Sequence, residues 1–600
     1  MELYEYFREL REEHGLTIKQ LSEGICSDSY VKLFETGQRE LNEFALFRLM
    51  ERLEIGEGSL QFFLKKKEHE LWVKRMEIID AIRKGEYTYA EEKIKKWKEQ
   101  NNKKDKYADQ FLRRMHSFCL IHRKAEAEEV CQEIVEAIKI TVPDFETGWK
   151  NKILSEQELD MMLDYYHYSG NNHVEDICCV INYMKLKSQS FSHNNILIGK
   201  AVTYYIEELL RVDDVLFWSK EQVINALELC SGALEALRKA ECGLYLLEIL
   251  EIRKRLLVEV QRRGIDENIA KLEQCECWIT ALEKGYDSIG ISRKTQEILR
   301  LYTMVNVESI SDVIRRRRLM LGISVEELAK DLCDVRTIKR IESGETTPQT
   351  LTGELLLERL HLPRAWVKGS FLSYDIDSRK RMRELIEAYS QGDYREVLRI
   401  VEREKLEASA SEAYNLQNME WYKIEAEYFL KSISKDETIQ LLKNNLSKSI
   451  RWKSIIDSEG GYVTLTEAKH ITAILQIMDI SDMEFPRLIK NVDNYVNSFF
   501  ETYREMNYSS MLYVAISILQ GRYAEIEKYT TASFLCERLA CEIQLHRDLN
   551  RLVFSSYNLW WNKNEQKKMI KEDRPSFLVD LSNLALNTKR ERFLHDKFNT

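Results

Sequence analysis

The chain repeats itself once, with a shift of 307 positions that holds without a gap over roughly its first hundred residues. Searching for such repeats is the first step in reading a long sequence, because they decide the architecture. The register is too long to follow from shared helix composition, so the chain consists of two copies of one unit, roughly 1–305 and 306–600. The identical pairs include Gly15/Gly322, Leu21/Leu328, Cys26/Cys333, Glu35/Glu342, Gly37/Gly344, Leu53/Leu360, Ala81/Ala388, Gly85/Gly392 and Tyr87/Tyr394.

Composition predicts an all-α fold. A chain of 600 residues exceeds what one hydrophobic core usually organises. It has only 5 Pro and 22 Gly beside 44% hydrophobic and 31% charged residues, which argues against a β-sandwich, a collagen-like chain or a long disordered region. The net charge of −10 gives no global basic signature of nucleic-acid binding, although a local one can lie within an acidic chain.

The 12 cysteines indicate reduced thiols and a cytoplasmic location. The close pairs Cys178-Cys179 and Cys275/Cys277 lack a second pair and histidines at zinc-site spacing, so we expect no metal and no other cofactor. The N-terminus lacks the layout of a signal peptide, and no apolar run approaches the ~20 residues of a membrane span. We therefore expect no membrane partner.

Each copy opens with four predicted helices. Thr17, with Gln20 three residues later, forms a capping-box pattern, and Ser27 can cap the third helix, which Gly37 closes. Two short helices joined by a tight turn inside a helical bundle are the helix-turn-helix plan. The predicted ranges are 3–13, 18–23, 28–36 and 44–53 in the first copy, and 311–321, 324–330, 335–343 and 351–360 in the second.

The runs LTIKQLSEGICSDSYVKLFETG (16–37) and ISVEELAKDLCDVRTIKRIESG (323–344) resemble the helix-turn-helix of the phage-repressor or Xre class. The first copy is the looser match, and Ile18 and Val325 replace the Gln that is common in helix 2 of the family. The layout resembles the peptide-pheromone-responsive Rgg- and PlcR-like regulators, which implies a DNA reader joined to a sensor for a signalling peptide. The second copy fits the family pattern at Glu326, Glu327, Leu328, Ala329, Ile338, Arg340, Ile341, Glu342 and Gly344.

Helical hairpins of tetratricopeptide type follow each helix-turn-helix domain, which is called a reader from here on. Residues 75–97 and 381–404 both read as a helix, a Gly-acidic-Tyr turn and a second helix with apolar residues three and four apart. A strict period is missing, so these are degenerate repeats that stack into a solenoid. Such a solenoid can serve as a scaffold without binding any ligand. The predicted domains are 1–68 (first helix-turn-helix), 69–305 (first solenoid), 306–372 (second helix-turn-helix) and 373–600 (second solenoid).

Charge predicts that the second copy dominates DNA affinity. Residues 3–65 hold 8 basic and 12 acidic side chains, a net charge of −4, whereas residues 310–372 hold 11 and 9, a net charge of +2. The predicted DNA-contacting side chains are Arg336, Thr337, Lys339 and Arg340 in the second recognition helix and Ser29, Tyr30 and Lys32 in the first, where Leu33 replaces Arg340 and Asp28 repels phosphate.

Two features of the reader leave alternatives open. The run Arg315–Arg318 is either a solvated charged face or a source of phosphate contacts. Regulators of this class bind paired half-sites as dimers, and here the pair is either a homodimer or a pseudo-dimer within one chain.

The ligand prediction depends on asparagine, whose side-chain amide matches a peptide backbone. Most of the candidates are expected to be merely exposed, with one or two in a groove. We find no catalytic motif and expect no enzyme, since His116 and His122 alone do not form a site. The alternative function is a protein-interaction scaffold with vestigial helix-turn-helix modules. The candidate ligand-binding residues are Asn182, Asn225, Asn415, Asn418, Asn494 and Asn497.

Overall fold

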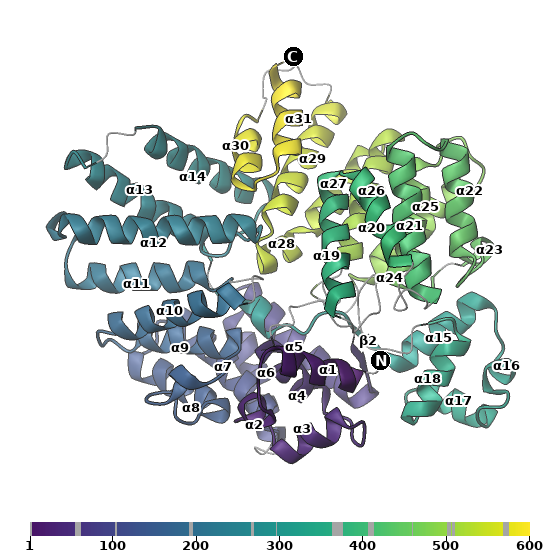
Figure 1. Cartoon of the computed structure of the whole chain (residues 1–600), viewed down its shortest axis with the longest axis horizontal. Coiled ribbons are helices and arrows are strands. Elements are labelled where there is room, and N and C mark those ends of the chain that lie inside the picture. Colours follow the sequence, from purple (N-terminus) through teal and green to yellow (C-terminus); the bar gives the residue numbers. More distant parts are fainter. Residues whose placement is uncertain are drawn as a thin grey trace.

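A computed structural model describes most of the chain, and among the residues it describes the fold is all-α apart from two short strands. Figure 1 shows the helices arranged in two large groups, with the earlier part of the chain on the left and the later part on the right. The described residues are 3–53, 62–101, 105–190, 196–265, 269–295, 297–362, 376–405, 413–458, 460–500, 506, 510–567 and 575–599.

The first copy consists of a four-helix reader followed by a solenoid in which successive helices pack on one another. The reader helices are α1 (Leu3–Glu13), α2 (Ile18–Ser22), α3 (Asp28–Glu35) and α4 (Glu43–Arg52), and strand β1 (Phe62–Leu64) follows them. The solenoid consists of α5 (Lys66–Arg83), α6 (Tyr87–Asn101), α7 (Lys106–His122), α8 (Ala127–Thr141), η1 (Trp149–Asn151), α9 (Glu156–Tyr168), α10 (Val174–Ser190), α11 (Ile198–Val212), η2 (Val215–Phe217), α12 (Lys220–Lys239), α13 (Leu246–Arg262), α14 (Ile269–Ile289) and η3 (Leu299–Tyr302).

The second copy repeats the plan. Strand β2 (Val307–Ser309) precedes the reader helices α15 (Ile310–Leu321), α16 (Val325–Ala329), α17 (Val335–Glu342) and α18 (Thr350–Arg359). The second solenoid consists of α19 (Ile376–Gln391), α20 (Tyr394–Lys405), α21 (Ala413–Phe429), α22 (Lys435–Leu446), α23 (Trp452–Asp457), α24 (Leu465–Ile477), α25 (Phe485–Ser498), α26 (Ser510–Glu525), α27 (Tyr529–Arg538), α28 (Ala540–His546), α29 (Leu549–Lys567), α30 (Phe577–Leu584) and α31 (Thr588–Asn599).

The predicted reader helices are confirmed to within one residue at each end, because their ends are fixed by local chemistry. The Thr17 hydroxyl accepts from the backbone N–H of Gln20, whose side chain in turn accepts from the backbone N–H of Thr17, so the predicted capping box is present. Ser27 caps α3 by accepting from the backbone N–H of Tyr30. Gly37 and Gly344 both follow their recognition helices with positive φ, a conformation that glycine adopts without strain.

Strands β1 and β2 join the two copies. They pair in parallel, with Phe62 opposite Val307 and Leu64 opposite Ser309. β1 follows the first reader and β2 precedes the second, so the pairing crosses the boundary between the copies. Nothing local in the sequence predicts this contact, because the partners lie more than two hundred residues apart.

Buried apolar residues form one large cluster and one small cluster. The large one includes the first reader and residues of both solenoids, whereas the small one belongs to the second reader and adds Phe63 from β1 and Tyr462 from the second solenoid. The first reader therefore shares a core with its solenoid, and the second has a core of its own with two residues supplied from outside.

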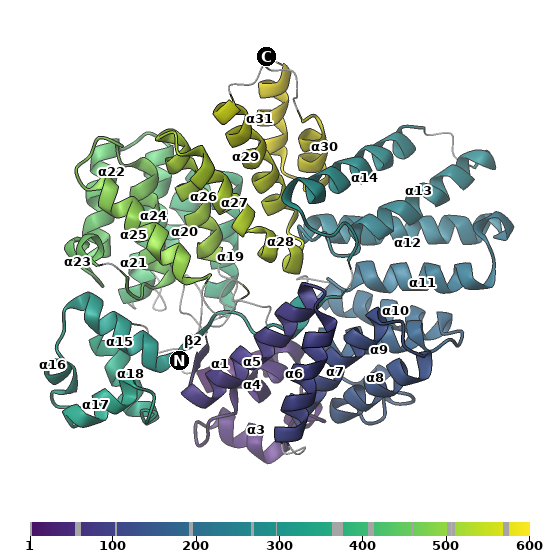
Figure 2. The same cartoon turned by 180° about the vertical axis from the view of Figure 1, so that it is seen from behind.

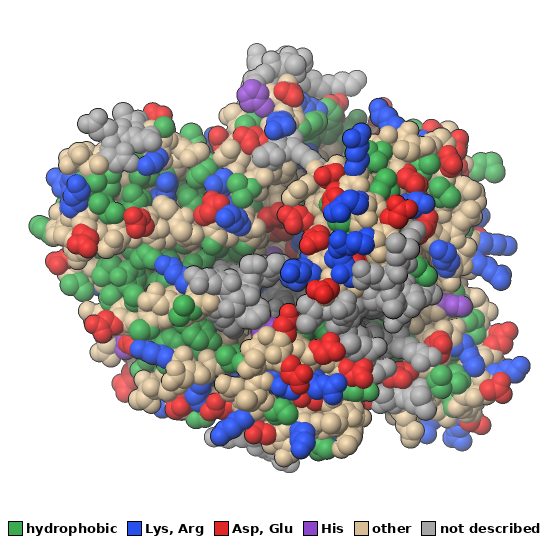
Figure 3. Space-filling model, in the orientation of Figure 1, with side chains coloured by type: hydrophobic (Ala, Val, Ile, Leu, Met, Phe, Trp, Pro, Cys, Tyr) green, Lys and Arg blue, Asp and Glu red, His purple; other side chains and the backbone are tan. Residues whose placement is uncertain are grey.

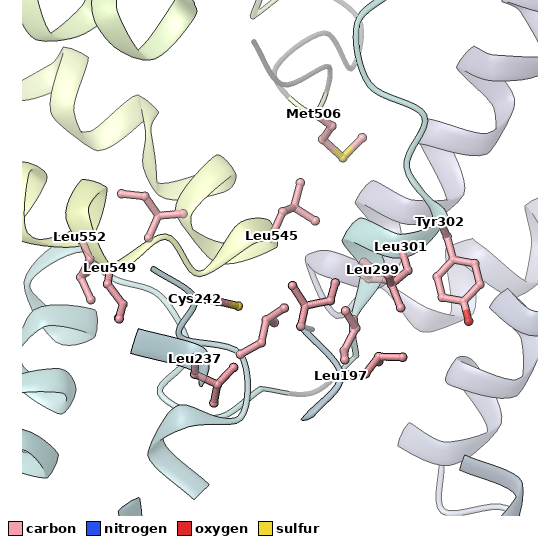
Figure 4. Close-up of a cluster of buried hydrophobic side chains, with 14 of the residues drawn as sticks. Leu197, Leu237, Cys242, Leu299, Leu301, Tyr302, Met506, Leu545, Leu549 and Leu552 are labelled. Carbon is pink, nitrogen blue, oxygen red and sulfur yellow. The ribbon is translucent and has the colours of Figure 1, made fainter. Parts of the chain in front are cut away.

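The two solenoids also meet directly. Helices α29 and α30 of the second copy pack on α14 of the first. Figure 4 shows the apolar contact between the copies, where Leu237 and Cys242 of the first copy lie near Leu545 and Leu549 of the second. Two backbone hydrogen bonds cross the same contact, from Gly243 N–H to Arg547 O (2.6 Å) and from Leu549 N–H to Glu241 O (2.9 Å).

Within the part of the chain that the structure describes, no helix combines the length and the apolar character needed to cross a membrane.

Candidate nucleic-acid interface

An ion pair at equivalent positions fixes the recognition helix in each reader. Arg11 of α1 contacts Glu35 of α3, with 2.6 Å between Nε and Oε1, and also donates to the carbonyl of Leu16. In the second copy Arg318 contacts Glu342 over the same 2.6 Å and donates to the carbonyl of Ile323. The hydrogen bond that each arginine donates to its glutamate raises the pKa of the arginine. The first helix therefore positions the recognition helix in the same way in both copies.

The second recognition helix, α17, has a strongly two-sided surface. Ile338 and Ile341 are fully buried in the small core. Arg336, Lys339 and Arg340 are exposed and lie three and four residues apart, which places them on one side of the helix. Thr337 is half-buried beside them. The four side chains predicted from sequence thus lie together on the open face of α17.

The first recognition helix, α3, offers fewer exposed cations. Ser29 and Lys32 are exposed, as predicted. Tyr30 is half-buried, its hydroxyl accepts a hydrogen bond from the backbone N–H of Asn42 (3.3 Å), and the Arg39 guanidinium lies 4.6 Å from the centre of its ring. The Asp28 carboxylate accepts from the Ser22 hydroxyl at 2.7 Å, which holds this acid at the start of the helix.

The turn between α2 and α3 is packed against the first solenoid. Gly24 has a positive φ, and a Cβ there would lie 2.7 Å from the carbonyl carbon of Thr141 and closer still to its oxygen. Lys106 donates to the carbonyl of Gly24 (2.9 Å), and the Tyr107 hydroxyl donates to that of Ile25 (2.7 Å). Only glycine fits this close approach of two backbones.

The equivalent turn of the second reader is open. Asp331, which the repeat pairs with Gly24, has the same left-handed backbone conformation, with φ of +60°. It is exposed, and aspartate is one of the few residues other than glycine that tolerate this conformation. The same turn therefore carries glycine where a solenoid covers it and aspartate where it does not.

A buried arginine holds each reader on its solenoid through a helix-capping glutamate. Arg52 at the end of α4 binds both carboxylate oxygens of Glu158 (2.7 and 3.3 Å), and Glu158 completes the capping box of α9 with Ser155. Burial alone would raise the pKa of Glu158, but Arg52 and the nearby Arg48 lower it to about 2. The carboxylate therefore stays charged and joins the reader to the solenoid.

The second reader is attached by an ion pair of the same kind, but the arginine comes from a different position. Arg317 of α15 binds both carboxylate oxygens of Glu467 (2.6 and 2.8 Å), and Glu467 completes the capping box of α24 with Thr464. Arg317 and Glu467 are both fully buried. Burial opposes ionisation of Glu467, but Arg317 outweighs it and lowers the pKa of this carboxyl group. A capping-box pattern ahead of an apolar run is visible in the sequence at both glutamates, and it is the signal that could have found them.

The run Arg315–Arg318 is not the solvated face that composition allowed. Arg315 alone of the four is exposed. Arg316 donates to the carbonyl of Gly461 (2.7 Å), while Arg317 and Arg318 hold the two buried or half-buried ion pairs described above. Three of these four arginines therefore hold the reader together or attach it to its solenoid.

The six candidate asparagines lie on four helices of the two solenoids. Asn182 on α10 and Asn225 on α12 are exposed in the first solenoid. Asn415 and Asn418 on α21 are fully buried, and Asn418 accepts a hydrogen bond from Lys469 (3.3 Å). Asn494 and Asn497 are half-buried, so the expectation that most of the six are exposed is wrong, and on α21 the reason is that helices enclose it on more than one side.

The remaining two lie on α25. Asn494 lines a pocket beside the second reader. Asn497 contacts Asp493 (3.4 Å) and accepts a hydrogen bond from Arg538. Their role in ligand binding stays a prediction.

Histidine and cysteine form no metal site among the described residues. His116 lies 3.2 Å from Glu133, and His122 pairs with Glu297, so the two histidines contact different acids. All 12 cysteines are free thiols.

Comparisons with known proteins agree with the local geometry of the readers. The helix-turn-helix family matches residues 7–60 and 314–367. No curated protein matches the chain. Among solved structures, the chain is similar to Bacillus thuringiensis PlcR in complex with the peptide PapR7 and DNA, with 16% identity and a TM-score of 0.28 over 48% of this chain and 96% of that chain.

A circular tandem repeat protein with novel repeat topology is also similar, with 12% identity and a TM-score of 0.11 over 98% of both chains.

Proposed function

We propose that the chain, which carries two helix-turn-helix domains of one family, is a DNA-binding transcriptional regulator whose solenoids sense a ligand. The observation that carries the proposal is the open, basic face of α17. Arg336, Lys339 and Arg340 extend from a helix whose other face is fully buried. Arginine and lysine in this position can reach guanine edges or phosphates.

The second reader supplies most of the DNA affinity in this proposal. Its net charge of +2 favours phosphate, whereas the first reader, at −4, opposes it. On the face seen in Figure 3, basic and acidic side chains are interspersed over most of the surface, so general attraction to DNA is weak and local contacts have to supply affinity.

One chain provides both readers of a paired site. The loop before α13 and the loop before α29 contact each other through an antiparallel bridge between Cys242 and Asp548. Helices α9 and α24 carry the equivalent capping boxes of the two copies. When helices are counted onward from these two, with α27 and α28 together as the counterpart of α12, the two loops occupy equivalent positions. Like surfaces that contact each other are typical of a twofold dimer. This supports an internal pseudo-dimer over a homodimer.

The placement of the recognition helices supports the same idea. Figures 1 and 2 both place α3 and α17 at the lower edge of the molecule. In this proposal a single duplex runs along that edge, with α17 as the strong reader and α3 as the weak one. Ser29 and Lys32 are the contacts we assign to α3, because Tyr30 is engaged within its own domain.

The sensed ligand is, in this proposal, a signalling peptide. Figure 3 shows hydrophobic side chains gathered over the region of α10–α12, the helices that include Asn182 and Asn225. Large exposed apolar side chains there include Leu186 and Phe217, at 70% and 78% exposure. Exposed apolar surface of this kind marks interaction sites, and asparagine can hold a peptide backbone. The same surface would suit the scaffold alternative, in which the readers do not bind DNA.

Mapping of genomic binding sites, with and without cell-derived peptide, tests the regulator against the scaffold. A regulator gives discrete sites with paired half-sites, and peptide changes their occupancy. Purified full-length chain is then tested on the strongest site. Absence of any enriched site under both conditions would overturn the regulator and favour the scaffold.

A further inference from the structure

A pocket lies between the second reader and the second solenoid. Arg316 and Met320 of α15 form one side, and residues of α23, α24 and α25 form the others. Its cavity volume is about 70 Å³, and the figure rises to about 600 Å³ only when all free space out to the open mouth is counted. A slender ligand that enters the pocket would therefore contact both the reader and the solenoid at once.

The walls of the pocket are mainly apolar. Ile455, Val463, Ala468, Ile471 and Val492 contribute aliphatic surface. Several polar residues in the wall are already satisfied by backbone partners, which leaves them little capacity for a polar ligand. Asn491 donates to the carbonyls of Ile455 and Ile456 (2.8 and 3.1 Å), Thr472 to that of Ala468 (2.8 Å), and Ser498 to that of Tyr495 (2.7 Å).

Arg316 is the single charged side chain among the described residues that line the pocket. One of its terminal nitrogens donates to the carbonyl of Gly461 at 2.7 Å. A guanidinium has five N–H donors in a planar fork, so others are available to a second acceptor. The pocket thus combines an apolar body with one permanent positive charge.

We propose that this pocket binds a small apolar carboxylic acid, with the carboxylate on Arg316 and the apolar part against the solenoid helices. Charge complementarity selects the carboxylate, since no acidic side chain among the described lining residues competes for Arg316. A free fatty acid and the C-terminus of a short apolar peptide both present this chemistry.

Occupancy would couple the ligand to the DNA reader, and this consequence rests on the proposed function. Arg316 lies on the same helix as Arg317, and Arg317 attaches the second reader to its solenoid through the ion pair with Glu467. A ligand that bridges α15 and the solenoid changes the free energy of that attachment. By linkage, DNA and ligand then alter each other's affinity by the same factor.

Calorimetry on the full chain tests the site without DNA. The probes are octanoate, 1-octanol and octylamine, which share an apolar tail and differ in charge. We expect octanoate to bind at one site, with 1-octanol roughly tenfold weaker and octylamine weakest. Equal affinity for octanoate and 1-octanol, or no binding of octanoate, overturns the proposal.

Variants locate the binding. Arg316→Gln should weaken octanoate about tenfold and leave 1-octanol unchanged, because it removes the charge and keeps a donor for Gly461. Ser498→Trp should block all binding by filling the pocket. Ser447→Trp is the matched control, since Ser447 also donates to a carbonyl three residues earlier but is exposed elsewhere. Octanoate binding that survives Ser498→Trp places the ligand at another site.

Two further arms separate the sources and the consequences. The affinity of N-acetyl-Leu-Leu with a free C-terminus is compared with that of octanoate. The tighter binder shows whether the carboxylate comes from a peptide C-terminus or from a fatty acid. The amidated form of the dipeptide should bind about tenfold more weakly, as 1-octanol does relative to octanoate, and equal binding of both forms overturns the proposed role of the carboxylate. If the chain fails to bind DNA while octanoate binds as expected, the regulator proposal fails and the site stands.

Discussion

The turn between α2 and α3 lies against the first solenoid, whereas the corresponding turn between α16 and α17 is exposed. Inside the two readers the Arg–Glu ion pair has the same geometry, at Arg11–Glu35 and at Arg318–Glu342. The readers thus share one internal construction and differ in how they are attached. Attachment and surface charge, rather than the helix-turn-helix fold itself, distinguish a covered reader from an open one.

The largest expected effect concerns the exposed cations of α17. Arg336→Glu, Lys339→Glu and Arg340→Glu together should weaken binding to a mapped site roughly a thousandfold, because three attractive contacts become repulsive. The matched change in the first reader, Ser29→Glu with Lys32→Glu, should weaken binding no more than about tenfold. Fluorescence anisotropy over a range of salt concentrations measures both. Equal losses from the two sets would break the proposed asymmetry.

The next effect concerns the buried ion pairs that hold the readers. Glu467→Gln should destabilise the attachment of the second reader by about 3 kcal/mol, because Arg317 then remains buried without its counter-charge. Glu158→Gln should do the same for the first reader through Arg52. Hydrogen-exchange mass spectrometry should show faster exchange over α15–α18 in one variant and over α1–α4 in the other.

The same two variants also show how deeply each reader is embedded in its solenoid. Since the first reader shares its core with the solenoid, loosening it should also raise exchange in α7–α9. The second reader has its own core, so loosening it should leave α21–α25 less affected. The reverse pattern would mean that the second reader is the more embedded of the two.

A reciprocal exchange at the turn gives a smaller effect. Gly24→Asp places a Cβ against the backbone of Thr141 and should cost about 2 kcal/mol. Asp331→Gly should change stability by less than about 1 kcal/mol, since that turn is open. Exchange rates at residues 20–27 and 327–334 report the two local stabilities. Comparable losses from both changes would show that coverage by the solenoid does not matter at this turn.

The smallest effect should be the same in both copies. Arg11→Lys and Arg318→Lys replace a bidentate guanidinium by a single ammonium, which should cost about 1 kcal/mol in each reader. Chemical denaturation of the two variants in parallel measures the difference between them. If one variant loses more than twice as much free energy of unfolding as the other, the same ion-pair geometry does not give the same stabilisation in the two readers.

Much of each reader followed from sequence because its signals are local. Thr17 with Gln20 caps a helix within four residues, and the spacing of Arg336, Lys339 and Arg340 fixes their common face. The burial of Arg317 could not be predicted in this way. It depends on Glu467, which lies 150 residues further along the chain, and in the sequence Arg317 is indistinguishable from the arginines beside it.

The asparagines show the same limit. Asn415 and Asn418 are polar residues in a helical pattern, which predicts an exposed face. In the structure α21 packs between neighbouring helices, and both side chains are buried. Phe63 and Tyr462 likewise complete the core of the second reader from distant segments, which no periodicity indicates.

The all-α class, the two copies and the helix-turn-helix of each copy follow from the amino-acid sequence alone, because helix ends and faces depend on residues within one or two turns. Which reader is covered, which arginines are buried and where a pocket joins reader to solenoid become visible only in the folded molecule. Those properties depend on contacts between segments far apart in the chain, and burial, which decides the role of a charge, exists only once those segments have packed.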